Sequence, residues 1–91
     1  MKEQIGAIIQ NIKKGVVFDS HYIINTLIIE NTDTYLKFAA EHKAESKFTE
    51  HIHSEIAKLI SSSKDIKDSG KNSLSYNIHG KASECRLWEK I

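Results

Sequence analysis

Apolar side chains recur at helical spacing along the chain as far as Ile60. In the first segment they stand at i, i+3, i+4 and i+7, which aligns them on one face of a helix: Ile5, Ile8, Ile9 and Ile12. The pattern returns in three further segments, each opened by residues that commonly cap a helix: Asp19 or Ser20, Thr32 or Asp33, and Ser46 or Thr49. The second helix should end near Asn31, and a break is expected around Lys43–Ser46. The sequence therefore predicts about four helices.

A period of two replaces the helical pattern in the last part of the chain. The polar segment Ser61–Asn72 predicts a loop, and the alternation in Leu74–Ile78 predicts a strand after it. A turn at His79–Ser83 leads to a further strand, Glu84–Ile91, so these two strands predict a hairpin. Val16–Phe18 is short and rich in β-formers, and we expect it to pair with the edge of the hairpin.

The alternation also predicts which side chains of the hairpin face the helices. The expected inner face consists of five residues: Leu74, Tyr76, Ile78, Cys85 and Leu87. Trp88 and Arg86 would then face away, and an exposed Trp beside an Arg is typical of a protein–protein hot spot. Trp88 is thus a candidate interface residue. Two alternatives are that Trp88 folds over a helix end or the N-terminal strand, or that a slipped register buries it.

Together these elements predict a single α+β domain over residues 1–91, with a mostly helical N-terminal body, a short strand and a C-terminal hairpin. Hydrophobic residues make up 40% and charged residues 27%, which excludes a disordered chain. Cys85 is the sole cysteine, so an internal disulfide is excluded and a reducing compartment is expected. No apolar run is long enough for a membrane span or a secretory signal. We therefore expect a cytoplasmic protein with no membrane partner.

The predicted elements follow one another as helix, strand, three helices and hairpin. Five segments follow one another in this order: IGAIIQNIKKG, VVF, DSHYIINTLI, TEHIHSEIAKLI and LSYNIHGKASECRLW. In this order the chain resembles the winged-helix family, in which the corresponding segments are a first helix, a short strand, a second helix, a recognition helix and a two-stranded wing. Residues 32–43 depart from the family pattern, because a compact winged helix does not need a helix there. The resemblance implies a protein that binds double-stranded DNA, such as a transcriptional regulator.

The resemblance also gives roles to two groups of polar residues. On the fourth helix, a polar stripe would face the major groove: Lys47, His51, Ser54 and Lys58. On the hairpin and just before it, a second group would contact the sugar–phosphate backbone: Lys71, Asn77, His79, Lys81 and Arg86. For the helix group, the alternative is an ordinary solvated face, on which Glu50 and Glu55 would repel phosphate. For the hairpin group, the alternative is an ordinary turn.

The charge balance of the chain bears on the DNA-binding hypothesis. Thirteen basic and twelve acidic residues give a net charge of +1, which is far from a strongly basic chain. The small basic surplus lies in residues 63–91. Since a lone module of this charge would bind DNA weakly at physiological salt, we expect a homodimer. The rival hypothesis is a protein-interaction module, such as an adaptor or inhibitor, on the same fold and without nucleic-acid binding.

The residue patterns predict no catalysis, no metal site and no cofactor. His51 and His53 point about 200° apart on a helix and cannot hold one ion together. His79 and Cys85 flank the hairpin turn, but a metal site there would need two more ligands. The triplet His53-Ser54-Glu55 resembles part of a zinc-deaminase motif whose proline and cysteine pair this chain lacks. Cys85 is more typical of a small core residue than of a nucleophile.

Overall fold

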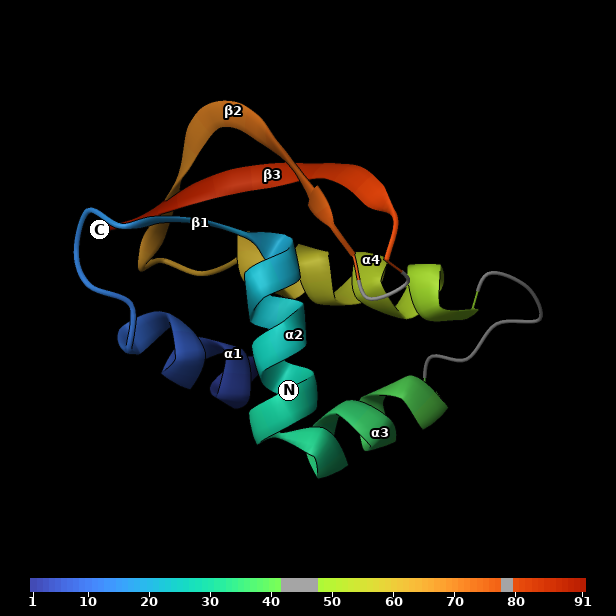
Figure 1. Ribbon diagram of the computed structural model, residues 1–91. Helices are drawn as coiled ribbons and strands as arrows, with labels where there is room; N and C mark the ends of the chain where they lie inside the picture. Colours follow the sequence, from blue (N-terminus) through green and yellow to red (C-terminus); the bar gives the residue numbers. More distant parts are fainter. Residues whose placement is uncertain (42–47, 78–79) are drawn as a thin grey trace.

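A computed structural model describes residues 1–41, 48–77 and 80–91 of the chain. The described residues form four helices and a three-stranded antiparallel sheet, in this order: α1 (Lys2–Gln10), β1 (Val17–Asp19), α2 (Ser20–Glu30), α3 (Thr32–Glu41), α4 (Phe48–Ser61), β2 (Ile66–Tyr76) and β3 (Ala82–Lys90). The α+β layout and the C-terminal hairpin are those that the sequence predicts. In Figure 1 the helices lie together on one side of the β2–β3 ribbon. None of these helices has both the length and the hydropathy that crossing a membrane requires.

The hydrophobic core forms where α1, α2 and α4 bring their apolar stripes together. Its largest fully buried side chains come from these three helices: Ile5, Ile9, Ile23, Leu27, Ile52, Ile56 and Ile60. The stripe predicted for the first helix is confirmed at Ile5, Ile8 and Ile9, whereas Ile12 lies beyond the end of α1 and is only partly buried against the core. Burying one such side chain stabilises the fold by about 1.5–3 kcal/mol. Within α3, Ala39 is the buried residue, and the break predicted around Lys43–Ser46 lies outside the described residues.

The chain passes from β1 into α2 without a connecting loop. Asp19 ends β1 in an extended conformation and is also the N-cap of α2. Its Oδ1 accepts a hydrogen bond from the backbone N–H of Tyr22 at 3.0 Å, which satisfies one of the donors that the first helical turn leaves unpaired. This confirms the predicted helix start, and it fixes the direction in which α2 leaves the sheet.

β3 is the central strand of the sheet, between β1 and β2. β1 pairs antiparallel with β3, and Phe18 lies opposite Trp88. The predicted pairing of the Val16–Phe18 segment with the hairpin is therefore confirmed, although the strand itself is Val17–Asp19, one residue later than predicted. Trp88 is partly buried against the core, and its Nε1–H donates to Ser20 Oγ at 3.4 Å. The outward orientation predicted for Trp88 is therefore wrong. The indole packs at the junction of β1 and α2, which is the first of the two alternatives.

β2 is longer than the sequence predicts. It begins at Ile66, inside the segment expected to be a loop, and Ile66 lies opposite Lys90 at the end of β3. The register shifts between Asp68 and Asn72, and Gly70 within this irregularity has a φ of +80°, a conformation that favours glycine. An edge strand with one face in solvent does not need apolar residues at alternate positions. Its polar composition therefore resembled that of a loop.

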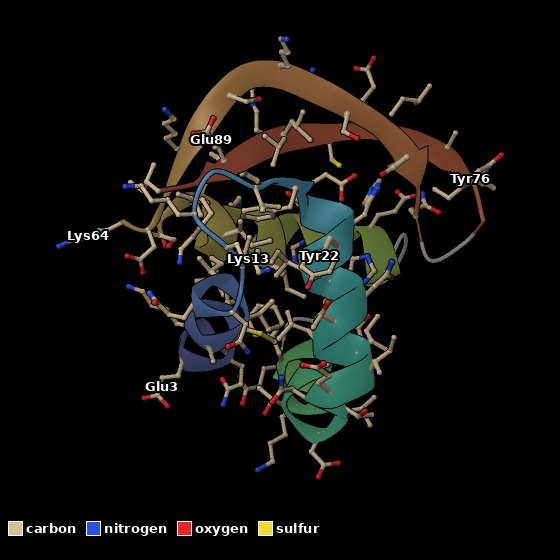
Figure 2. All side chains as sticks on the ribbon, turned by 60° about the vertical axis from the view of Figure 1, so that its left-hand side comes forward. Glu3, Lys13, Tyr22, Lys64, Tyr76 and Glu89 are labelled. Carbon is tan, nitrogen blue, oxygen red and sulfur yellow. The ribbon has the colours of Figure 1, made fainter. Side chains whose placement is uncertain are left out.

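The inner face predicted for β2 is inverted. Leu74 and Tyr76 are 72% and 73% exposed. Figure 2 shows Tyr76 at the outer end of the hairpin. Ser73 and Ser75, which the prediction placed outside, are half-buried and donate hydrogen bonds to Asp19. This part of β2 therefore packs against the Asp19 carboxylate at the start of α2 and not against an apolar surface.

β3 agrees with its prediction more closely. It begins at Ala82, two residues before the predicted start, and Cys85 and Leu87 are half-buried. The remaining predicted inner residue, Ile78, lies outside the described residues. Cys85 lies beside Asp19 and His21 at the start of α2, but Trp88, and not Leu87, is the neighbouring side chain that packs against the core. The predicted inner face therefore holds at Cys85 and fails at Leu74 and Tyr76.

Truncation of a core isoleucine should cost far more stability than truncation of an exposed one. Ile56 is 0% exposed and Ile29 is 78% exposed. We expect Ile56→Ala to lower the free energy of unfolding by about 2–5 kcal/mol, because it leaves a cavity among the three helices. Ile29→Ala should stay within about 0.5 kcal/mol of the wild type. Urea unfolding followed by circular dichroism measures both, and equal losses would contradict the core described above.

Candidate functional site

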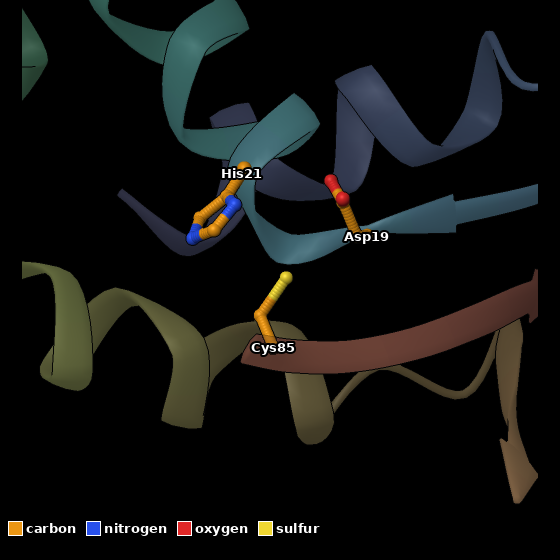
Figure 3. A group of neighbouring side chains, drawn as sticks. All are labelled: Asp19, His21 and Cys85. Atoms are coloured by element: carbon orange, nitrogen blue, oxygen red, sulfur yellow. The ribbon is translucent and has the colours of Figure 1, made fainter. Parts of the chain in front are cut away.

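A polar cluster lies where the start of α2 meets the hairpin. Asp19 comes from the end of β1 and His21 from the first turn of α2, and four residues of the ribbon complete the cluster: Ser73, Ser75, Ser83 and Cys85. Ser73 lies opposite Cys85 and Ser75 opposite Ser83, so these four project from the same face of the ribbon. Figure 3 shows Asp19, His21 and Cys85 close together, with Cys85 on β3 facing the start of α2.

Hydrogen bonds run through the polar cluster from Ser83 to Asp19. The hydroxyls of Ser75 and Ser73 donate to Asp19 Oδ2 at 2.8 and 3.1 Å. Since the Ser75 proton is used in that bond, we assign His21 Nδ1–H as the donor to Ser75 Oγ. His21 Nε2 then accepts from Ser83 Oγ at 3.2 Å. The network holds both strands of the hairpin against the first turn of α2.

Asp19 is the charged centre of the polar cluster. Partial burial raises its pKa, but hydrogen bonds from Ser75 Oγ, the Tyr22 N–H and Ser73 Oγ more than offset that effect. The pKa of the Asp19 carboxyl therefore lies below its ordinary value. Because the ionised form is the one that accepts these bonds, the network is complete at neutral pH.

Cys85 faces this carboxylate as a neutral thiol. Burial raises the pKa of Cys85, and the charge of Asp19 raises it further. Backbone N–H groups of His21 and Ser20 and the Ser75 hydroxyl lower this pKa, but their effect is smaller. A thiol whose pKa is raised is a poor nucleophile. The neighbourhood of a histidine therefore does not make Cys85 an activated cysteine.

Three residues of the cluster bring together donor atoms that metals accept. One such atom each from Asp19, His21 and Cys85 lies within 4.8 Å of the other two, and all three residues are half-buried. Sequence reasoning paired Cys85 with His79, which lies outside the described residues. The histidine that the fold brings to Cys85 is His21. Within the sequence, the one visible sign of this group is that Asp19 stands two residues before His21 at a helix start. The approach of Cys85 to these two residues depends on the fold.

A pocket of about 350 Å³ opens beside the polar cluster, between α2, α4 and β3. His21 and Cys85 line this pocket, together with Ile24 of α2, His53 of α4 and Trp88 of β3. A concave site with an apolar wall and a few converging polar groups is the usual setting for a small ligand. The pocket gives ions and small molecules access to the polar cluster.

The residues predicted to face a DNA groove lie on the outer side of α4. His51, Ser54 and Lys58 are exposed, whereas the isoleucines of the same helix are buried. Lys58 Nζ forms an ion pair with Glu55 at 3.0 Å, so one of the flanking acidic residues partly neutralises the stripe. Lys47, the first residue of the predicted stripe, lies outside the described residues.

Three of the residues predicted to contact the sugar–phosphate backbone of DNA are exposed basic residues on the ribbon and at its turn. Lys71 on β2 and Lys81 beside the turn extend into solvent. Arg86 on β3 is exposed as well, and its Nε lies 3.3 Å from a carboxylate oxygen of Asp68 across the ribbon. Arg86 would have to exchange this surface ion pair for a phosphate, and such pairs are weak enough for that exchange.

Asn77, the fourth predicted contact, organises the turn. Its backbone N–H donates to the Lys81 carbonyl at 2.9 Å, and its Oδ1 accepts from the Lys81 N–H at 3.2 Å. The fifth, His79, lies outside the described residues. Asn77 also lines the pocket together with Glu50 at the start of α4, so the end of the hairpin and the start of α4 are neighbours.

Comparisons of the chain with protein-family models, with curated proteins and with solved structures found no match. Function is therefore inferred from the fold, from the polar cluster and from the exposed basic side chains of α4 and the ribbon, which are Lys58, Lys71, Lys81 and Arg86.

Replacement of Asp19 by Asn should flatten the acid dependence of stability. Asn still caps α2 but lacks the charge that the two serine hydroxyls stabilise. In the wild type the folded-state pKa lies below the unfolded value of about 4, so the stabilisation is complete above that pH and is lost as the pH falls through the folded-state value. Urea unfolding at a series of pH values measures the slope. At neutral pH we expect a loss of about 1 kcal/mol, allowing for solvent screening.

Asp33→Asn is the matched control, since Asp33 is exposed in the first turn of α3 and takes no part in the polar cluster. This variant should keep the acid dependence of the wild type. An Asp19→Asn variant with the same slope as the wild type would contradict the ionised, hydrogen-bonded state assigned to Asp19.

Proposed function

We propose that this chain is a small DNA-binding protein of the winged-helix type and a candidate transcriptional regulator. The observation that carries the proposal is the order of its elements, in which a strand after the first helix pairs with a C-terminal hairpin and α4 directly precedes that hairpin. This is the order on which the resemblance to the family rests. α3 occupies the residues that depart from the family pattern.

α4 has the two faces that a recognition helix needs. Ile52, Ile56 and Ile60 anchor one side in the core, so the helix is held rigidly. His51, Ser54 and Lys58 on the other side are exposed. Side chains of these types donate hydrogen bonds to phosphates and to the purine acceptors of the major groove. α4 is therefore the element that we propose to enter the groove.

The hairpin provides the proposed wing. Lys71 and Lys81 are exposed, and residues 63–91 carry the small basic surplus of the chain. Because the end of the hairpin lies beside the start of α4, both can approach one duplex at once. With few phosphate contacts per copy, binding should be weak and strongly dependent on salt.

A protein-interaction module is the second candidate, and the exposure of Leu74 and Tyr76 favours it. Both side chains lie on β2, an edge strand of the described sheet. An open edge that carries exposed apolar side chains is a template for pairing with another strand. We propose that the partner is a second copy of the chain, joined through β2. The interface role predicted for Trp88 thus passes to Leu74 and Tyr76, since Trp88 is packed against the core.

Neutralising the proposed wing should weaken DNA binding in a salt-dependent way. We expect the wild type to bind a labelled duplex of mixed sequence at low salt, with a dissociation constant no weaker than about 100 μM. Lys81→Gln should weaken binding and reduce the slope of log K against log salt by about one. His51→Gln together with Lys58→Gln should weaken it further. Fluorescence anisotropy over a series of salt concentrations measures these effects.

Lys13→Gln is the control for Lys81→Gln. Lys13 is exposed near the end of β3 that is opposite the turn, because the next residues pair with Lys90. It should leave the affinity nearly unchanged. Absence of binding by a folded wild type, or an equal loss in both lysine variants, would remove the DNA-binding proposal.

A charge on β2 should abolish self-association. Leu74→Glu places a carboxylate in the proposed strand-to-strand contact and should give a monomer, whereas the wild type is expected to be a dimer at micromolar concentrations. Ile29→Glu, an equally exposed isoleucine on α2, is the control and should stay dimeric. Light scattering after size exclusion measures the mass. A monomeric wild type, or a dimer that survives Leu74→Glu, would argue against this interface.

A further inference from the structure

We propose that Asp19, His21 and Cys85 form a binding site for a divalent transition metal, with Zn²⁺ as the preferred ion. The site is distinct from the proposed DNA-binding and dimer surfaces, because its three residues belong neither to the groove and wing residues nor to the exposed side chains of β2.

The spacing of the three donor atoms fits a small tetrahedral ion after a modest adjustment. Zn²⁺ binds carboxylate oxygen and imidazole nitrogen at about 2.0–2.2 Å and thiolate sulfur at about 2.3 Å, which places its ligands about 3.5 Å apart. The donor atoms here lie within 4.8 Å of one another. They therefore need to approach by at most about 1.3 Å, which small side-chain rotations at His21 and Cys85 can supply.

The chemistry of the donors selects the class of ion. A thiolate excludes the hard cations Mg²⁺ and Ca²⁺, which take oxygen ligands, and favours Zn²⁺ and its neighbours. The imidazole of His21 and the carboxylate of Asp19 complete a mixed set of the kind that zinc accepts. Three protein ligands leave a fourth position for solvent or for a small ligand, and the pocket lined by His21 and Cys85 gives access to it.

The charges at the site also favour a cation. Ionised Asp19 and the sulfur of Cys85 face each other, and within the described part of the chain no lysine or arginine forms a salt bridge with Asp19. A divalent ion bound between the two groups would balance the charge of Asp19 and displace the thiol proton to solvent.

Hydrogen bonds around Asp19 and His21 orient these two residues in the way that metal ligands require. Asp19 is held by Ser73, Ser75 and the backbone of Tyr22. The two ring nitrogens of His21 each contact a serine hydroxyl, so one nitrogen can bind the metal while the other keeps its serine. Such outer contacts fix the ring orientation, and their loss commonly weakens metal binding by about 10–100-fold.

Cobalt provides a visible probe for the site. Titration of the full chain with Co²⁺ under reducing conditions should produce a sulfur-to-cobalt charge-transfer band and the strong visible bands of tetrahedral Co²⁺. Zn²⁺ should then displace the cobalt and bleach these bands, because Zn²⁺ has no geometric preference from its d electrons and accepts a tetrahedral site with a thiolate more readily than Co²⁺ does. Cys85→Ser should lack the charge-transfer band, and His21→Gln should weaken Co²⁺ binding by about tenfold or more.

His51→Gln is the control, since His51 is exposed on the outer face of α4, and its titration should match that of the wild type. Circular dichroism establishes that each variant is folded. Amide chemical shifts of the wild type give a second measurement that needs no variant, and Zn²⁺ should shift the signals of Asp19, His21 and Cys85 most. Absence of a cobalt band in the folded wild type, or zinc-induced shifts centred elsewhere, would overturn the proposal.

Discussion

The carboxylate of Asp19 ties together three parts of this molecule that are distant in the sequence. It ends β1, caps α2 through Tyr22, and accepts the hydroxyls of Ser73 and Ser75 from β2. Each of these contacts involves an ionised acceptor, which makes a hydrogen bond stronger than one between neutral groups. The Asp19 carboxylate therefore helps to position the hairpin on the helical body, together with the pairing of β1 with β3 and the packing of Trp88.

This constraint explains which features of the fold could be predicted from the sequence. The apolar stripes of α1, α2 and α4 are local, with a period that the chain itself displays, and the predicted cores of these helices agree with the buried isoleucines. The pairing of β1 with the hairpin was predictable for a related reason, because a short β-prone segment needs an edge on which to pair. In β2, by contrast, the polar partners come from elsewhere in the chain. The alternation of apolar and polar residues predicted that Leu74 and Tyr76 face the helices. Instead, Ser73 and Ser75 face them, because their hydroxyls bind Asp19.

The candidate sites divide in the same way. The exposed stripe of α4 follows from its own spacing, so His51, Ser54 and Lys58 lie on the outer face as predicted. The cluster of Asp19, His21 and Cys85 does not follow from any spacing. It forms because α2 begins directly at the end of β1 and because the hairpin passes over that point. In the sequence His79 and Cys85 flank the hairpin turn, whereas the histidine that the fold brings to Cys85 is His21, from a helix.

The two proposed activities occupy different parts of one small scaffold. The basic residues lie on the outside of α4 and on the ribbon, and the residues of the proposed metal site lie where the ribbon packs against the start of α2. A bound ion would bridge Cys85 of β3 to the start of α2 and so restrain the same hairpin that is proposed to act as a wing. That arrangement makes the orientation of the wing sensitive to the contacts of Asp19.

A double-mutant cycle between Asp19 and Ser75 tests the dependence on this carboxylate most directly. The free energy of unfolding of the wild type, Asp19→Asn, Ser75→Ala and the double variant gives the coupling between the two side chains. A charge-assisted bond that fastens the hairpin to α2 predicts a coupling of about 0.5–2 kcal/mol. Strictly additive effects of the two substitutions would contradict this account, because Asp19 and Ser75 would then act independently on the stability of the fold.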